Sequence, residues 1–123
     1  MTLGPGVVLP KSTAHQAITC IGALLQAYRQ EPRTAPAQAV GELADDRKDL
    51  EHRLRASGDN TVRVPAVTLS RIAGHLTDGA QAEAGSDALQ AALWRTAGRL
   101  QRWVAEAPPL QASRAGAVLK VKR

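Results

Sequence analysis

The longest stretch without Asp, Glu, Lys or Arg runs from Ser12 to Tyr28, and it constrains the fold more than any other feature. Its seventeen residues carry Ile, Leu and Ala at helical spacing, which predicts a helix over about residues 12–30. Because such a helix is apolar nearly all round, it needs cover on more than one side, either from its own fold or from a partner subunit. On the second alternative, Ile21 and Leu24 are candidate interface residues.

The composition favours helices over strands. The apolar residues are mainly Ala, Leu and Val, with no Phe, one Tyr and two Trp. Ala and Leu are strong helix formers, whereas the β-branched and aromatic residues that strands favour are sparse outside a few short runs. A chain of 123 residues is the usual size of one domain. We therefore expect an all-α fold, a small four-helix bundle-like domain over residues 12–107 with helices at about 12–30, 36–56, 65–77 and 87–107.

The remaining segments are expected to lack regular structure. Residues 1–11 are rich in Gly and Pro and predict an extended arm, and residues 108–123 begin with a Pro pair and predict a basic flexible tail. Residues 59–64 alternate as a short strand does, but a single strand has no evident partner, so we expect a loop. Residues 78–87 predict a flexible link. A short pairing between the two ends of the chain is the alternative, and no internal repeat is evident.

The charge of the chain is concentrated in its last third. Residues 1–87 hold nine basic and ten acidic side chains, whereas residues 88–123 hold seven basic and one acidic. Such an excess attracts phosphates, an acidic protein face or an anionic surface. Three arginines at i, i+4 and i+7 share one helix face, which we call the basic ridge: Arg95, Arg99 and Arg102. With the tail cations Arg114, Lys120, Lys122 and Arg123, they are the candidate residues for binding nucleic acid or an acidic partner.

Two alternatives compete with a binding role for the basic ridge. It is also explained as a solvated helix face, or as a surface that packs on the acidic face of the second helix. Trp94 lies on a helical wheel away from both the core stripe and the ridge, which makes it a candidate interface anchor or a platform for a base. The alternative is that another helix of the same fold covers Trp94.

The acidic run at residues 45–49 matches the D-D-x-x-D pattern by which isoprenoid synthases hold magnesium, but the chain is far too short for that fold. Glu42, Asp45, Asp46 and Asp49 fall on one face, opposite the apolar seam of their helix. A metal-dependent hydrolase needs acidic ligands on a second helix as well, and no matching cluster is present. Because basic residues are interleaved with these acids, we expect a solvated, salt-bridged face.

Other catalytic and ligand motifs are weak. Residues 69–76 resemble the first half of a helix-turn-helix, but the following segment lacks the apolar residues that a recognition helix needs. The three histidines and the single Cys20 have no metal-ligand spacing, and no Gly-rich phosphate loop is present. We therefore expect no metal, no cofactor and no enzymatic activity.

The sequence predicts a non-catalytic helical subunit or accessory protein of a larger assembly, which binds nucleic-acid backbone without reading its sequence. The second hypothesis is a protein–protein interaction module, such as an adaptor, inhibitor or assembly chaperone, that uses the first helix and Trp94. A small metal-dependent hydrolase is the third. Self-association is compatible with the apolar first helix. Because the first residues lack the pattern of a signal peptide and no stretch suits a membrane span, we expect a cytoplasmic protein.

Overall fold

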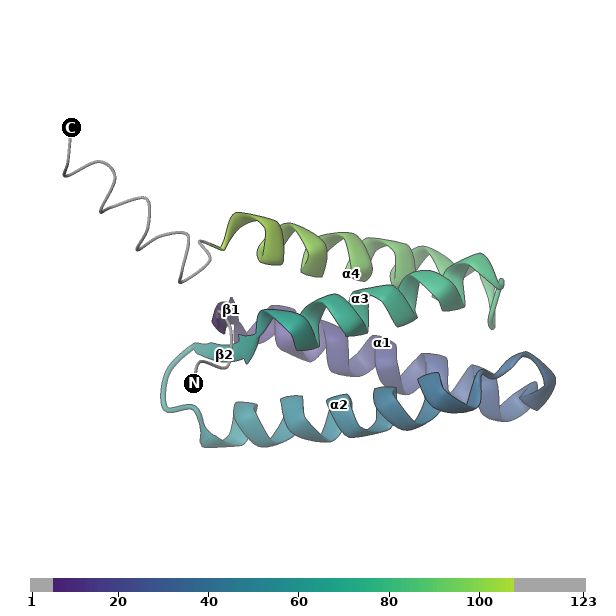
Figure 1. The fold of residues 1–123 in the computed structure, drawn as a ribbon, viewed down its shortest axis with the longest axis horizontal. Helices are drawn as coiled ribbons and strands as arrows, with labels where there is room; N and C mark the ends of the chain where they lie inside the picture. Colours follow the sequence, from purple (N-terminus) through teal and green to yellow (C-terminus); the bar gives the residue numbers. More distant parts are fainter. Residues whose placement is uncertain (1–5, 108–123) are drawn as a thin grey trace.

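The computed structural model describes residues 6–107 of the chain. This part is mostly helical, as predicted, and it also contains a two-stranded sheet that the sequence pattern does not predict. Its elements are, in order, β1 (Gly6–Pro10), α1 (Lys11–Gln30), the short 3-10 helix η1 (Pro32–Thr34), α2 (Ala37–Ala56), β2 (Thr61–Pro65), α3 (Ala66–Gln81) and α4 (Asp87–Glu106). Figure 1 shows two antiparallel helix pairs, α1 with α2 and α3 with α4, and the small sheet at one end of them.

The two strands pair antiparallel, and each supplies the partner that the other needs. Val7 lies opposite Val64 and Leu9 lies opposite Val62, and all four side chains are buried. Between the first pair and the second, Val8 points outward and is 44% exposed. The arm and the loop predicted for these two segments are therefore wrong. The alternation of each segment is a weak signal alone, and it specifies a sheet only when the two segments meet.

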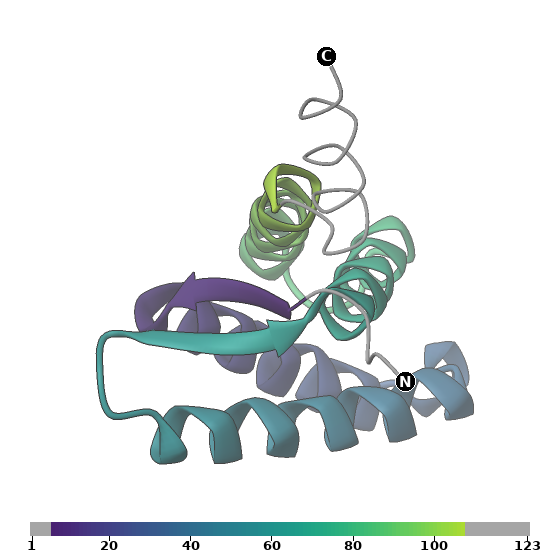
Figure 2. The same cartoon turned by 60° about the vertical axis from the view of Figure 1, so that its left-hand side comes forward.

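Apart from the short η1, the order strand, helix, helix occurs twice, which divides the chain into the halves β1–α1–α2 and β2–α3–α4. Figure 2 shows the two strands side by side. The strand pairing is centred on Val8 opposite Arg63, and each strand ends in a proline that leads directly into a helix. When α2 and α4 are aligned from their first residues, the buried Leu43 and Leu93 coincide. The strand pairing is thus symmetric about this position, and the same order of elements follows on each side of it. The sequence does not reveal this repeat, because few of the matched residues are identical.

Helix α1 lies centrally and packs on the three other helices and on both strands. Ile21 and Leu24 are fully buried by these elements. The cover that the uncharged stretch requires therefore comes from the chain's own fold. Ile21 and Leu24 are core residues, which corrects their assignment as interface residues. The polar side chains on the remaining face of α1, among them His15 and Thr19, are exposed.

Helix α3 is longer than predicted, because it continues through residues 78–81 where the sequence indicates a flexible link. Glycine has a low intrinsic helix propensity, but a Cβ at Gly79 would lie 2.7 Å from Cδ1 of Leu24. The missing side chain thus lets α3 approach α1 closely, and the neighbouring Ala80 is buried in the same contact region. Tertiary packing outweighs the local propensity that predicts a break.

A left-handed residue ends α3 and provides a test of the fold. Glu83 has φ 57°, its N–H donates to the carbonyl of Ala80 over 3.0 Å, and the N–H of Ala84 donates to that of Gly79 over 3.0 Å, as in a Schellman cap. Glycine adopts this conformation without the steric cost of a Cβ. We expect Glu83→Gly to raise the free energy of unfolding by about 1 kcal/mol in urea denaturation. The control Gln81→Gly, at the last residue of α3, should not raise it, and a Glu83→Gly protein less stable than its parent would contradict the cap.

Candidate anion-binding groove

Helix α4 turns the basic ridge toward solvent. The hydroxyl of Ser86 begins the helix by accepting a hydrogen bond from the N–H of Leu89 over 3.1 Å. Leu93 and Leu100 are fully buried in the core, so the opposite face of α4 points outward. That face carries the three exposed side chains of the ridge, Arg95, Arg99 and Arg102.

No guanidinium group of the basic ridge forms an ion pair within residues 6–107. Arg99 Nη1 donates to Oε1 of Gln16 on α1 over 2.8 Å, and this is the ridge's one hydrogen bond in the described part of the chain. Helix α4 packs on α3, α1 and β1. The alternative in which the ridge packs on the acidic face of the second helix is therefore wrong, and the ridge keeps its positive charge available to an outside anion.

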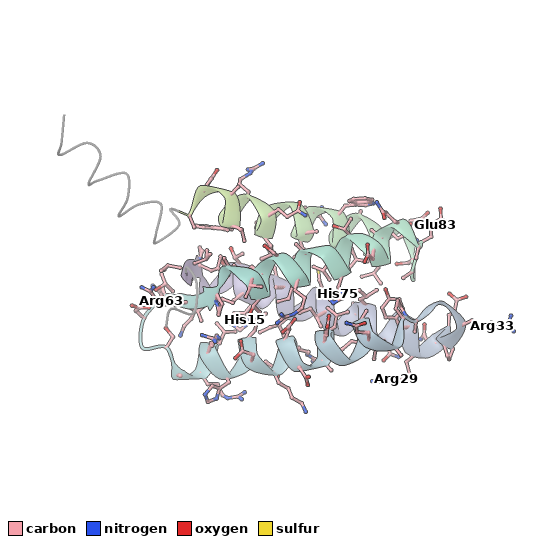
Figure 3. The ribbon with its side chains drawn as sticks, in the orientation of Figure 1. His15, Arg29, Arg33, Arg63, His75 and Glu83 are labelled. Carbon is pink, nitrogen blue, oxygen red and sulfur yellow. The ribbon has the colours of Figure 1, made fainter. Side chains whose placement is uncertain are left out.

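A depression of about 290 Å³ opens between α1 and α4 and includes Arg95; we call it the α1–α4 groove. Its mouth carries exposed polar side chains, and Figure 3 labels one of them, His15 of α1. Its floor is polar but uncharged, because the buried Cys20 Sγ lies 3.1 Å from Oγ1 of Thr96 and 3.8 Å from the carbonyl oxygen of Ala92. The other residues that line it are Gln16 and Thr19.

The helices that border the α1–α4 groove are almost free of carboxylates. Helix α1 has no Asp or Glu from Lys11 to Gln30, and α4 has none between Asp87 and Glu106. The field of the arginines is therefore not cancelled by acidic neighbours on the same helices, and an anion that enters the groove is attracted. The uncharged stretch of α1 thus also leaves the solvent face beside the groove without acidic side chains.

Two acidic side chains of α2, Glu42 and Asp46, instead face α3 and form ion pairs with it. Asp46 is 5% exposed and accepts two hydrogen bonds from Arg71, Nε to Oδ2 over 3.0 Å and Nη2 to Oδ1 over 2.7 Å. Glu42 Oε1 lies 2.7 Å from His75 Nε2. Hydrogen bonds from Gln38 and from His75 lower the pKa of Glu42. The solvated, salt-bridged face predicted for these acids is therefore wrong at Asp46, which is buried, whereas the side chain of Glu42 is 35% exposed and forms an ion pair. Both carboxylates join α2 to α3.

The Asp46–Arg71 pair is expected to stabilise the fold. Arg71→Gln leaves the carboxylate of Asp46 buried without a cationic partner, a change that costs about 3 to 5 kcal/mol when both groups are buried. The side chain of Arg71 is 38% exposed, so solvent screens part of this cost. We expect the free energy of unfolding to fall by about 2 kcal/mol in urea denaturation. Lys48→Gln, on the exposed side of α2, is the control and should change it by less than about 0.5 kcal/mol. Equal losses in both variants would argue against the pair.

Trp94 is 49% exposed, so the alternative in which another helix covers it is wrong. It lies two residues from both Ala92 and Thr96, which line the α1–α4 groove, and this spacing places it on roughly the opposite side of α4. Trp103, by contrast, packs partly buried against the core. The ridge is therefore flanked by the groove on one side and by an exposed aromatic ring on the other.

The sequence does not single out the α1 side of the groove. His15, Gln16 and Thr19 have no motif, and only tertiary packing brings them beside the basic ridge. The available signal is the absence of acidic residues from a helix with a polar solvent face. The other predicted binding residues lie outside the described part of the chain, together with the predicted tail: Arg114, Lys120, Lys122 and Arg123.

Within residues 6–107, no group of three or more His, Cys, Asp or Glu side chains is arranged to hold a metal ion. In the same range, none of the helices combines the length and the apolar character needed to cross a membrane. No protein-family model, curated protein or solved structure matches the chain.

Proposed function

We propose that this chain is a non-catalytic helical protein that binds the sugar–phosphate backbone of nucleic acid without reading its sequence, as a subunit or accessory of a larger assembly. The observation that carries the proposal is the basic ridge, which has three exposed guanidinium groups and no ion pair in the described part of the chain. Guanidinium groups bind phosphate oxygens through two parallel hydrogen bonds, and phosphate contacts give affinity without sequence information.

The length of the ridge suits a polymer of phosphates better than a single anion. Arg95 and Arg102 are separated by about 10 Å along the helix axis, at ~1.5 Å per residue. Each strand of a duplex places a phosphate every ~3.4 Å along its axis, so the ridge is long enough to meet about three successive phosphates. The arginines are on one face of α4, which allows them to meet the same strand.

Direct titration tests this function. The parent protein should bind labelled single-stranded and double-stranded oligonucleotides of unrelated sequence at low salt, with affinity that depends little on sequence and falls as salt increases. Fluorescence anisotropy measures both properties. Failure to bind any oligonucleotide at low salt would sink the proposal, and strong preference for one sequence would remove its claim of sequence independence.

A protein-interaction module is the second candidate, and the exposure of Trp94 favours it. Tryptophan is enriched in the desolvated centres of interfaces, where its truncation costs more than about 2 kcal/mol of binding free energy. If Trp94 is an anchor for a protein, Trp94→Ala should leave oligonucleotide affinity and its salt dependence unchanged. If the ring instead stacks on a base, Trp94→Ala should weaken single-strand binding by about 1 to 3 kcal/mol and leave duplex binding unchanged. Titration of both oligonucleotide types distinguishes the two roles.

A further inference from the structure

We propose that the α1–α4 groove is a discrete site for one phosphate group, built from side chains of both helices; the proposal rests on the proposed function and adds a place where the strand is held. Its ligand is a phosphate monoester or diester group, and the site residues are His15, Gln16, Thr19 and Arg95. All four line the depression of about 290 Å³. That volume is roughly ten times the share of one water molecule in the liquid, which is room for a phosphate and part of its sugar.

The donors at the groove suit the oxygens of a phosphate. Arg95 offers a fixed fork of N–H groups, and the imidazole of His15 and the hydroxyl of Thr19 each offer a further donor from the other side of the groove. The amide of Gln16 accepts from Arg99 through Oε1, so its NH₂ group remains as a donor. The oxygens of a phosphate group are arranged tetrahedrally, so donors on two helices can share them, and a monoester offers three terminal oxygens.

The groove is already organised before a ligand arrives. The hydrogen bond from Arg99 to Gln16 joins the ridge to α1, and the contact of Cys20 with Thr96 fixes the floor. The floor is neutral, so it neither repels an anion nor supplies a competing counter-charge. Of the site residues, Gln16 is held in this way, so it loses less conformational entropy when it binds a ligand.

The repeated order of strand and helices allows equivalent positions in the two halves to be compared. Counted from the proline before each helix, Gln16 and Cys20 of α1 match Arg71 and His75 of α3. Between α2 and α3, the side chains of Arg71 and His75 bind carboxylates of α2. In the α1–α4 groove the smaller residues leave that space open.

The residues on the opposite wall change in the same sense. Counted from the first residues of α2 and α4, Ala92 stands where α2 has Glu42, and Thr96 stands where it has Asp46. Arg95 takes the place that corresponds to Asp45. The α2–α3 contact and the α1–α4 groove therefore differ. Internal ion pairs join α2 to α3. The α1–α4 groove is open, has no carboxylate among its lining residues and carries Arg95. This is the arrangement expected if the open one receives an anion from outside.

Variants of the α1 wall test the site without touching the ridge. His15→Ala and Thr19→Val are expected to weaken binding of labelled oligothymidine by roughly tenfold or more each, since each removes one hydrogen bond to a charged group. Thr19→Val removes no charge, so it should lower affinity at every salt concentration without changing the salt slope. His52→Ala, an exposed histidine of α2, is the matched control and should bind as the parent does. All three sites are exposed on their helices, and circular dichroism checks that the folds are equal.

A second measurement separates this site from the proposed function. The NMR signals of the His15 ring are followed while inorganic phosphate or oligothymidine is added, with sodium chloride at equal ionic strength as the reference. A saturable shift with inorganic phosphate that Arg95→Gln removes supports the site, even if no oligonucleotide binds and the proposed function fails. Oligothymidine binding that His15→Ala and Thr19→Val leave unchanged overturns the site while the function stands. No saturable shift with either ligand overturns the site as well.

Discussion

Leu24→Asp is expected to abolish the cooperative unfolding transition, because the new carboxylate would be buried with no partner. Leu24 is 0% exposed and lies where α1 and α3 approach each other at Gly79. Burying an unpaired charge there disfavours the folded state by more than the ~5 to 15 kcal/mol that usually stabilises a domain. Thermal and urea scans by circular dichroism should therefore show an unfolded chain, and the same result is expected for Ile21→Asp.

Two further variants keep this prediction informative. Leu24→Ala should remain folded and lose about 2 to 5 kcal/mol, the usual range for a buried leucine. Gln26→Asp adds the same charge to an exposed position of α1 and should change stability by less than about 0.5 kcal/mol. A folded Leu24→Asp protein with the stability of its parent would show that this side chain is not part of the core.

Replacing all three ridge arginines by glutamine is expected to flatten the salt dependence of oligonucleotide binding. Each phosphate contact that is lost removes ~0.7 to 0.9 log unit of affinity per log unit of salt, so the slope should fall by roughly 2 to 3 units. Titration of labelled oligonucleotides at several salt concentrations measures the slope. Stability should change little, because the three side chains are exposed and form no ion pair in the described part of the chain.

A charge-matched control distinguishes contact from general attraction. Arg29, Arg33 and Arg55 are also exposed, and their replacement by glutamine removes the same net charge from other faces of the molecule. The control should weaken binding only slightly through the long-range field. If both triple variants change the slope equally, the ridge has no special role, and if the ridge variant keeps the parental slope, its arginines do not contact phosphates.

The sequence predicts well the features that depend on local pattern. The four helices follow from apolar periodicity and from prolines and glycines between them, and the basic ridge follows from the i, i+4, i+7 spacing of Arg95, Arg99 and Arg102. These features need no knowledge of which elements become neighbours. Helix boundaries fail only at the end of α3, where Gly79 is held in the helix by contact with another element.

The features that the sequence misses all depend on long-range pairing. The strands at Val7 and Val64 are each too short to be recognised alone, and their partners lie far apart along the chain. Similarly, His15 and Thr19 line the α1–α4 groove only because α1 lies against α4. Asp46 lies in an acidic run that is typical of a solvated helix face. Only the position of α3 buries it and pairs it with Arg71. Periodicity alone does not contain this information.

The joining of two equivalent halves in one chain has a consequence for polarity. A symmetric dimer made from two copies of one half would present two identical surfaces, and a polymer bound across its axis would be held equally in either direction. Here β2–α3–α4 differs in sequence from β1–α1–α2, and the two halves are joined through strands that pair at Val8 and Arg63. The two halves are therefore distinguishable, because α2 carries the acidic run of residues 45–49 and α4 carries the basic ridge. A directional polymer that lies along α4 meets a surface that has a direction of its own.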